Sequence, residues 1–392
     1  MENGETQSEY EARVTPLELF FDLVFVFGLT QVTGMLSADP SWEGLARGLL
    51  VLGALWWAWV AYAWLTNTLD PEEESVRLAM LAAMAAMLLV ALSVPLAFGQ
   101  DAALFGVAYL LVRVLHLVLY AIAGKGDPDL MGAVARFAPT AVAGPGLIIA
   151  AAFFDGVEQG ALWAAALVVD YIGALLGRGR GWRVSPGHFA ERHGLIVMIA
   201  LGESIVALGI GAGALHLDTG TIVAAVLGII VISALWWSYF DWFSLAGERL
   251  LSRVEGVARA SLARDAYSYL HLPFVAGIVL FALGLKKTLG DVGHHLDTVP
   301  AVALCGGLAL YFFGHVAIRF RLNRSIGRGR ATATLVLAAL IPVALAVPAL
   351  VALTLVAAAC TALIAYEVIR FREDRYRIRR EGALPQADVR AT

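Results

Sequence analysis

Long apolar segments recur along the whole chain, and they constrain its fold more than any other feature. Each is close to the roughly 20 residues that a helix needs to cross the hydrocarbon core of a bilayer. Of the 392 residues, 60% are hydrophobic and 15% are charged, whereas soluble domains carry about 25% charged residues. Because helices satisfy their backbone hydrogen bonds internally in lipid, the sequence predicts an all-α polytopic membrane protein.

The apolar segments predict twelve transmembrane helices, the last two separated at Pro348. The expected spans are 17–36, 42–67, 76–99, 102–123, 131–153, 160–177, 190–213, 219–242, 267–287, 297–320, 331–346 and 348–370. Arginines are concentrated in alternate connections, whereas the other connections hold only Lys286 and Lys287. By the positive-inside rule, this distribution predicts that both termini lie in the cytoplasm.

These spans divide the chain into four expected parts. Residues 1–16 form a polar, acidic cytoplasmic segment without the basic region and cleavage site of a signal peptide. Residues 17–180 and 181–370 each hold six spans, and residues 371–392 form a basic cytoplasmic tail.

Similar segments in the two halves predict an internal duplication. The second span contains "ALWWAWVAYAW" and the eighth contains "ALWWSYFDWF". Weaker matches follow in order: Arg113 and His315 each follow a tyrosine by four residues, and Asp170 in the sixth span matches Glu367 in the twelfth. Chance similarity of apolar helices is the alternative for each weak pair. Two repeats of six spans share one orientation, the parallel plan found in many transporters.

Helix-breaking residues lie at corresponding places in the fifth and eleventh spans. The fifth contains Gly144, Pro145 and Gly146, and the eleventh contains Pro342. Proline removes a backbone donor and glycine loosens a helix. Interrupted helices in two repeats are typical of a substrate or ion site, while a packing kink is the alternative interpretation.

The first span carries two carboxylates one helical turn apart. Thr15, Pro16 and Glu18 match a capping box with proline at the first helical position, which gives Glu18 a structural explanation. Asp22 lies one turn deeper, where a carboxylate must pair, titrate or face water. We therefore expect a functional role for Asp22.

Other polar side chains complete the candidate site. Arg113, Asp170 and Glu203 lie near the expected midplane, where they would pair with one another, because isolated charges are costly there. A structural ion pair between Arg113 and Asp170 is the alternative. The candidate substrate or ion site comprises Asp22, Arg113, Asp170, Glu203, Glu18, His315, Glu191 and His193.

Motifs for nucleotide or metal chemistry are not apparent. His188 and His193 are five residues apart rather than the four that place two ligands on one helix face. The sequence shows no Walker loop or nucleophile elbow in a usable context, and no basic face suggests nucleic acid. We expect no cofactor, no metal and no disulfide between Cys305 and Cys360.

The stretches "PLELFFDLVFVFGLTQV" and "ERHGLIVMIALGESIVALG" resemble the bacterial low temperature requirement A (LtrA) family over nearly the whole chain. This resemblance implies a multi-pass protein of the bacterial cytoplasmic membrane, and leaves its activity open. A remoter similarity is to potassium channels of lysosomes and bacteria with a Phe-Ser-Asp signature. Here the triplet is Phe20-Phe21-Asp22, without the serine.

The leading functional hypothesis is a secondary transporter or ion-coupled permease that uses the intramembrane carboxylates. A cation channel and an integral membrane enzyme acting on lipid are the alternatives, and an enzyme is the less favoured of these classes. Expected partners are membrane lipid and a small solute or ion, and the sequence leaves a homo-oligomer open. It specifies neither the substrate, the coupling ion nor the transport direction.

Overall fold

The computed structural model describes residues 14–69, 73–176, 179, 181–213 and 218–373, which are mostly helical. The first half contains α1 (Pro16–Ala38), α2 (Trp42–Leu65), α3 (Glu74–Ser93), α4 (Ala102–Ala123), α5 (Pro128–Ala151) and α6 (Gly156–Leu176). The second half contains α7 (Pro186–Gly213), α8 (Thr219–Phe240), α9 (Phe243–Ser252), α10 (Gly256–Ala263), α11 (Leu272–Gly290), α12 (Thr298–Ala301), α13 (Gly307–Asn323), α14 (Arg328–Ala339), α15 (Ile341–Ala344) and α16 (Ala349–Arg370). Residues 1–13 of the expected N-terminal segment and 374–392 of the tail lie outside the described residues.

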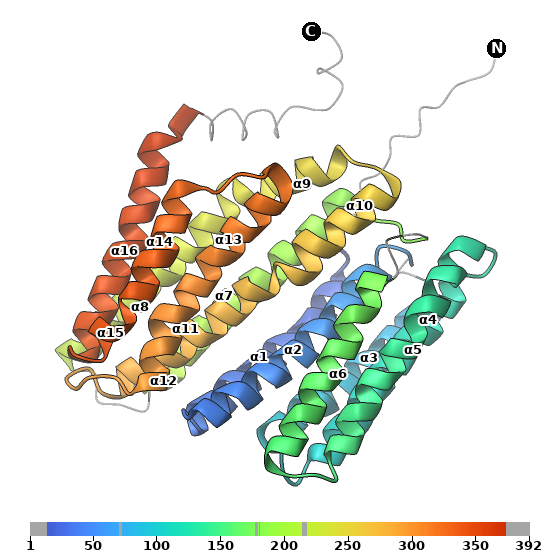
Figure 1. Cartoon of the computed structure of the whole chain (residues 1–392), viewed down its shortest axis with the longest axis horizontal. Coiled ribbons are helices and arrows are strands. Elements are labelled where there is room, and N and C mark those ends of the chain that lie inside the picture. The colour runs from blue at the N-terminus through green and yellow to red at the C-terminus, as the bar shows by residue number, and fades with distance from the viewer. Residues whose placement is uncertain (1–13, 70–72, 177–178, 180, 214–217, 374–392) are drawn as a thin grey trace.

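The long helices run side by side as one bundle, with the two halves of the chain on opposite sides (Figure 1). The short helices α9 and α10 lie at one end, which we call the α9–α10 end, and α12 lies at the other. Helices α1 and α2 of the first half contact α7 and α11 of the second. These four helices therefore form the interface between the halves.

Each half has the same order of packing. In the first, α1 contacts α2 and α3, and the contacts continue from α3 to α4, α5 and α6, with α6 returning to α2. In the second, α7 contacts α8 and α11, and the contacts continue from α11 to α13, α14 and α16, with α16 returning to α8. Each of these pairs in one half thus has a counterpart in the other.

Ten helices in the described part of the chain are long and apolar enough to cross a membrane. This confirms a polytopic all-α membrane protein. Two of the twelve expected spans are not among those ten. The expected sixth span corresponds to α6, and the expected eleventh corresponds to α14 and α15. The eleventh is shorter because the helix is interrupted between Ala339 and Ile341.

The break expected at Gly144, Pro145 and Gly146 is absent, because α5 continues through both Pro139 and Pro145. Gly144 instead allows close packing against α6. A Cβ atom at this position would lie 3.1 Å from the Ala166 carbonyl oxygen. The glycine therefore serves a close helix contact rather than an interruption.

Proline does divide the last apolar run. Pro342 lies in the first turn of α15, and Pro348 is the N-cap residue of α16. A proline is tolerated at these positions because the first amides of a helix have no partner within the helix. The expected interruption at Pro342 and separation at Pro348 are thus confirmed.

Glycines bring α11 into close contact with the segment before α13. A Cβ atom on Gly284 would lie 2.6 Å from the Leu304 backbone nitrogen. Leu304 belongs to a π-helical turn, Val302–Gly306, that leads into α13. Because the obstructing atoms include backbone, this contact cannot accommodate a side chain without a helix shift.

We predict that Gly284→Ala lowers the free energy of unfolding by roughly 1–3 kcal/mol, the usual cost of overpacking. Gly34→Ala is the matched control, since a Cβ at Gly34 would meet no atom within 4 Å. Alanine is favoured over glycine within a helix, so this control should be neutral or stabilising. Thermal unfolding of the purified variants in detergent measures the difference, and equal melting temperatures would contradict the packing argument.

Candidate functional site

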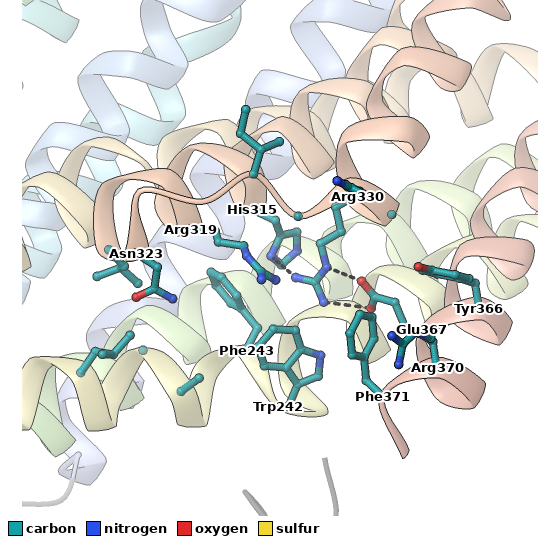
Figure 2. A pocket seen from close by; sticks show the side chains of 18 residues that line it. Trp242, Phe243, His315, Arg319, Asn323, Arg330, Tyr366, Glu367, Arg370 and Phe371 are labelled. Atoms are coloured by element: carbon teal, nitrogen blue, oxygen red, sulfur yellow. Dashed lines mark hydrogen bonds and ion pairs between the residues drawn. The ribbon is translucent and has the colours of Figure 1, made fainter. Parts of the chain in front are cut away.

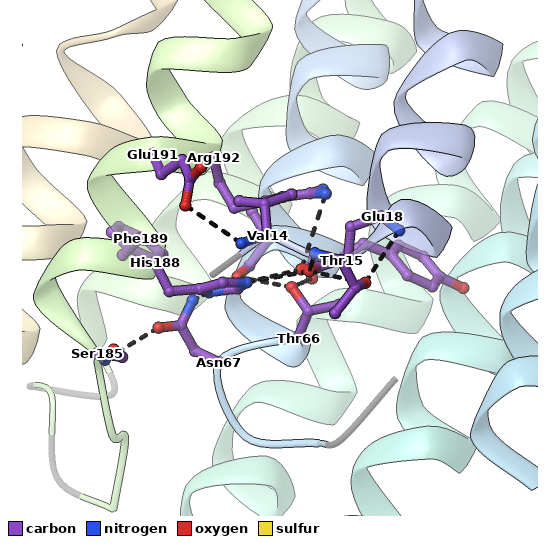
Figure 3. Close-up of polar contacts among 12 residues, drawn as sticks. Val14, Thr15, Glu18, Thr66, Asn67, Ser185, His188, Phe189, Glu191 and Arg192 are labelled. Carbon is purple, nitrogen blue, oxygen red and sulfur yellow. Dashed lines mark hydrogen bonds and ion pairs between the residues drawn. The ribbon is translucent and has the colours of Figure 1, made fainter. Parts of the chain in front are cut away.

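The beginning of α1 is held by the expected capping box. The Glu18 amide donates to Thr15 Oγ1 at 3.3 Å, and the Thr15 amide donates to Glu18 Oε2 at 2.9 Å. Glu18 also has a tertiary partner, because His188 Nε2 donates to its carboxylate at 2.9 Å. Glu18 is therefore both a helix cap and a member of a buried cluster (Figure 3).

Helix α7 begins as α1 does, and the two beginnings lie together (Figure 3). Val14 and Thr15 precede α1, which begins at Pro16, and Val184 and Ser185 precede α7, which begins at Pro186. The Val14 amide donates to Glu191 Oε2 at 3.2 Å, across the two segments. This contact aligns the two helices so that side chains at corresponding positions of α1 and α7 face each other.

A buried arginine lies between the two carboxylates of α1. Arg192 Nη2 donates to Asp22 Oδ1 at 2.9 Å, while Arg192 Nη1 is 3.8 Å from Glu18 Oε1. Trp59 Nε1 donates to the same Asp22 oxygen at 2.9 Å. All three charged side chains are at most 1% exposed, so this ion pair is inaccessible to water in the observed state.

The contacts between α1 and α7 repeat at one sequence separation. Glu18 pairs with His188 and Asp22 pairs with Arg192, each 170 residues apart. We call the contact between these two helices the α1–α7 seam. It joins acidic residues on one helix to basic residues on the other.

Several buried polar atoms of this seam have no hydrogen-bond partner among the described residues. They are Asp22 Oδ2, His188 Nδ1, Arg192 Nε and Nη1, and His193 Nε2. Leaving a buried polar group unpaired costs about 1–3 kcal/mol. The seam therefore retains capacity for other hydrogen bonds.

His193 lies next to this cluster among aromatic rings. Its ring centre is 4.9 Å from that of Trp59, 5.0 Å from Tyr267 and 5.3 Å from His271. Its Nδ1 donates to the Phe189 carbonyl oxygen at 2.8 Å, which leaves Nε2 as the acceptor atom. His193 therefore contacts aromatic side chains of both halves at their interface.

Glu203 has separate partners, further along the same seam. The Thr30 hydroxyl donates to its carboxylate, and Thr33 and Lys286 also interact with it. Thr33 and Glu203 have the same sequence separation as the two pairs above. Glu203 therefore belongs to the seam but not to the Arg192 cluster.

Arg113 and Asp170 form the ion pair considered as the structural alternative. Arg113 Nη2 lies 2.9 Å from Asp170 Oδ1, and the side chains are 0% and 2% exposed. Tyr109 and Phe137 complete its surroundings, the first by a hydrogen bond of 3.4 Å to Asp170 and the second by a cation–π contact with Arg113. This pair lies within the first half and joins α4 to α6.

His315 belongs to a third cluster, in the second half. Arg330 Nη1 donates to His315 Nδ1 at 2.7 Å, and Arg330 also binds both oxygens of Glu367, at 2.8 and 3.0 Å. Arg330 Nη2 further donates to the Ser238 carbonyl oxygen at 2.9 Å. The cluster joins α13, α14 and α16 in the same way that the Arg113 pair joins α4 and α6.

The expected site residues are therefore divided among separate clusters. Glu18, Asp22, His193 and Glu203 lie along or beside the seam, and Glu191 contacts its exposed beginning. Arg113 and Asp170 form one separate cluster and His315 another. Gly144 lies beside Asp170, whereas Pro342 lies in the first turn of α15.

Sequence reasoning missed Arg330, Trp59 and the pairing role of Arg192. Arg330 counted only as a basic residue of a connection, although the lone carboxylate Glu367 in the last span needed a cationic partner. Aligning Thr15-Pro16 with Ser185-Pro186 would have matched Asp22 with Arg192. The described residues contain no group of three metal-binding side chains.

We predict that Arg113→Gln lowers the free energy of unfolding by roughly 3–5 kcal/mol, because Asp170 would remain buried without its cation. Arg113→Gln combined with Asp170→Asn should recover part of this loss. Arg183→Gln is the control, since Arg183 pairs with Asp127 at 2.7 Å but is 77% exposed, and such pairs contribute about 1 kcal/mol or less. Thermal unfolding in detergent measures the loss of stability in each variant. Equal losses in Arg113→Gln and Arg183→Gln would refute the prediction.

Comparison with known proteins places the chain in a family. The description "Bacterial low temperature requirement A protein" belongs to the family whose sequence profile matches residues 13–365. An uncharacterized protein of Rhizobium meliloti (strain 1021) is 32% identical over 314 residues, covering 76% of this chain and 75% of that protein. No solved structure matches the chain. The chain belongs to the bacterial low temperature requirement A (LtrA) family.

Proposed function

We propose that this protein is an ion-coupled secondary carrier of the bacterial inner membrane, and that the α1–α7 seam is its coupling element. The observation that supports the proposal most is the position of Arg192, which lies between Asp22 and Glu18 at the contact between the halves. The cargo is a small solute or ion. Asp170 and Arg113 have a structural role in this proposal, because their partners lie within one half.

Arg192 provides a physical basis for coupling. Its Nη2 atom is at hydrogen-bond distance from Asp22, whereas Nη1 is 3.8 Å from Glu18. If Asp22 takes up a proton, the attraction between Arg192 and Asp22 falls and the attraction to Glu18 remains. A small movement of the guanidinium would then exchange one carboxylate partner for the other.

The proposed movement would act at the contact between the two halves. Glu18 and Asp22 belong to α1, and Arg192 and His188 belong to α7, so a change of partner changes the interaction between halves. Carriers with parallel repeats achieve alternating access largely by rocking one half against the other. The polar atoms without partners in the seam would form the new hydrogen bonds, with the Arg192 nitrogens donating and Asp22 Oδ2 accepting.

We further propose that the halves are duplicated six-span repeats, twelve spans in all, with both termini in the cytoplasm. The matching order of helix contacts supports duplication, as do the pairs Glu18–His188 and Asp22–Arg192 at one sequence separation. In addition, Pro145 precedes Pro342 by the same number of residues as Asp170 precedes Glu367. The arginine distribution supports the orientation.

We predict that a pH step applied to the reconstituted protein on a solid-supported membrane produces a transient charge displacement. Protonation of the seam followed by rearrangement moves charge without requiring cargo. Asp22→Asn should abolish most of this signal, because the side chain can no longer exchange a proton. Glu158→Gln, an exposed carboxylate in the first turn of α6, should leave it unchanged.

The double variant Asp22→Asn and Arg192→Gln is the control for folding. It removes both charges of the Asp22–Arg192 pair and leaves Glu18 with His188, so it should yield a stable protein without the transient. A normal transient in Asp22→Asn would contradict the coupling role of Asp22. A sustained current that follows the pH gradient would instead identify a channel and refute the carrier.

A further inference from the structure

A large pocket opens at the α9–α10 end of the second half, away from the seam. Its volume is about 660 Å³, and it lies between α9, α13, the beginning of α14 and the end of α16 (Figure 2). Trp242, Phe243, Leu250 and Leu322 form part of its apolar wall. The pocket could therefore hold a molecule with a sizeable apolar portion.

Four arginines and a single carboxylate are found among the described residues that line this pocket. The arginines are Arg319, Arg328, Arg330 and Arg370, and the carboxylate is Glu367. Both Glu367 oxygens accept hydrogen bonds from Arg330. The only acid of the lining is thus already neutralised by one of the four cations.

Arg330 is fixed in place as the floor of the pocket. Besides Glu367, it binds His315 Nδ1 and the Ser238 carbonyl oxygen, and its guanidinium lies 5.2 Å from the Trp242 ring centre. The other three arginines lie around it, and Arg328 and Arg370 are exposed. Their positive charges have no counterpart among the acidic residues of the lining.

The beginning of α14 adds further donors at the same place. Gly327 is its N-cap and has no side chain with which to cap the helix. Gly327, Arg328 and Gly329 all line the pocket. Because the first amides of a helix lack partners within it and carry partial positive charge, this helix end favours an anion, as arginine forks favour phosphate oxygens.

Exposed apolar and aromatic side chains lie at and beside the pocket. Ile369 is 79% exposed, Ile326 is 59% exposed and Tyr366 is 47% exposed. Ile326 and Tyr366 also line the pocket. Aromatic and cationic side chains at the end of membrane helices are typical of the headgroup region, so the pocket opens where lipid headgroups are expected.

We propose that this pocket binds the phosphate-bearing headgroup of an anionic phospholipid. The guanidinium groups of Arg319, Arg328 and Arg370 and the first amides of α14 contact the phosphate. The apolar wall contacts the beginning of the acyl chains. Binding at this site does not depend on the seam, so it holds whether or not the seam couples an ion.

The test is binding of short-chain phosphatidylglycerol to the purified full-length protein in detergent, measured by isothermal titration calorimetry. Phosphatidylcholine with the same chains tests the requirement for net negative charge, and inorganic phosphate tests whether the head alone suffices. We expect phosphatidylglycerol to bind about tenfold more tightly than phosphatidylcholine. Both lipids carry the phosphate, but the quaternary ammonium of choline adds a positive charge that the arginines of the pocket repel. Salt should weaken the binding.

The variant Arg319→Gln with Arg370→Gln should weaken phosphatidylglycerol binding by about tenfold or more. Arg324→Gln is the matched control, because Arg324 is near in sequence but does not line the pocket, and its affinity should remain within about twofold. Unchanged melting temperatures would show that both variants fold.

Three results would overturn the proposal. Equal affinities for phosphatidylglycerol and phosphatidylcholine would remove the requirement for an anionic head. An equal loss in the Arg324→Gln control would indicate general attraction to a basic surface. Inorganic phosphate that binds as tightly as phosphatidylglycerol would identify a soluble phosphate-bearing solute rather than a lipid.

Discussion

The structure depends on the cost of placing charge in hydrocarbon. A charged side chain near the centre of a membrane helix costs about 2.5–3.5 kcal/mol on insertion scales, and pairing with an opposite charge reduces this cost. Arg192 meets this requirement between Asp22 and Glu18, Arg113 meets it with Asp170, and Arg330 meets it with Glu367. Pairing of buried charge thus determines which helices must lie together.

The three arginines have different consequences because they join different elements. Arg113 connects α4 to α6 in the first half, and Arg330 connects α13, α14 and α16 in the second. Arg192 connects the two halves and has a second carboxylate within reach. Two pairs are therefore suited to hold each half rigid, and one is suited to change when the halves move.

Much of the architecture could be predicted from sequence because it follows from local patterns. The apolar runs, the capping box at Thr15 and Glu18, and the separation at Pro348 depend on neighbouring residues, and all are present. The interruption expected in α5 was wrong, because Gly144 packs against α6 and the helix continues through Pro145. Packing between α5 and α6, rather than the local sequence, therefore determines the helical conformation at Gly144 and Pro145.

The clusters were harder to predict, since pairing depends on distances between helices. The sequence indicated that Asp22, Arg113, Asp170 and Glu203 needed partners. The ion pair between Arg113 and Asp170, which was the alternative interpretation, is present, whereas Glu203 lies apart from both. It did not identify Arg192 as the partner of Asp22, because that required the register of α1 against α7. The pocket at Arg330 was missed for a similar reason, since residues from four helices build it.

The central claim is that Asp22 exchanges a proton and that Arg192 responds. The most direct measurement is a pH-difference infrared spectrum of the protein in membranes. The account predicts a protonated-carboxyl band that is lost in Asp22→Asn, together with a guanidinium band that is lost in Arg192→Lys. A spectrum in which both bands persist in these variants would contradict the claim and leave the seam as a static ion pair.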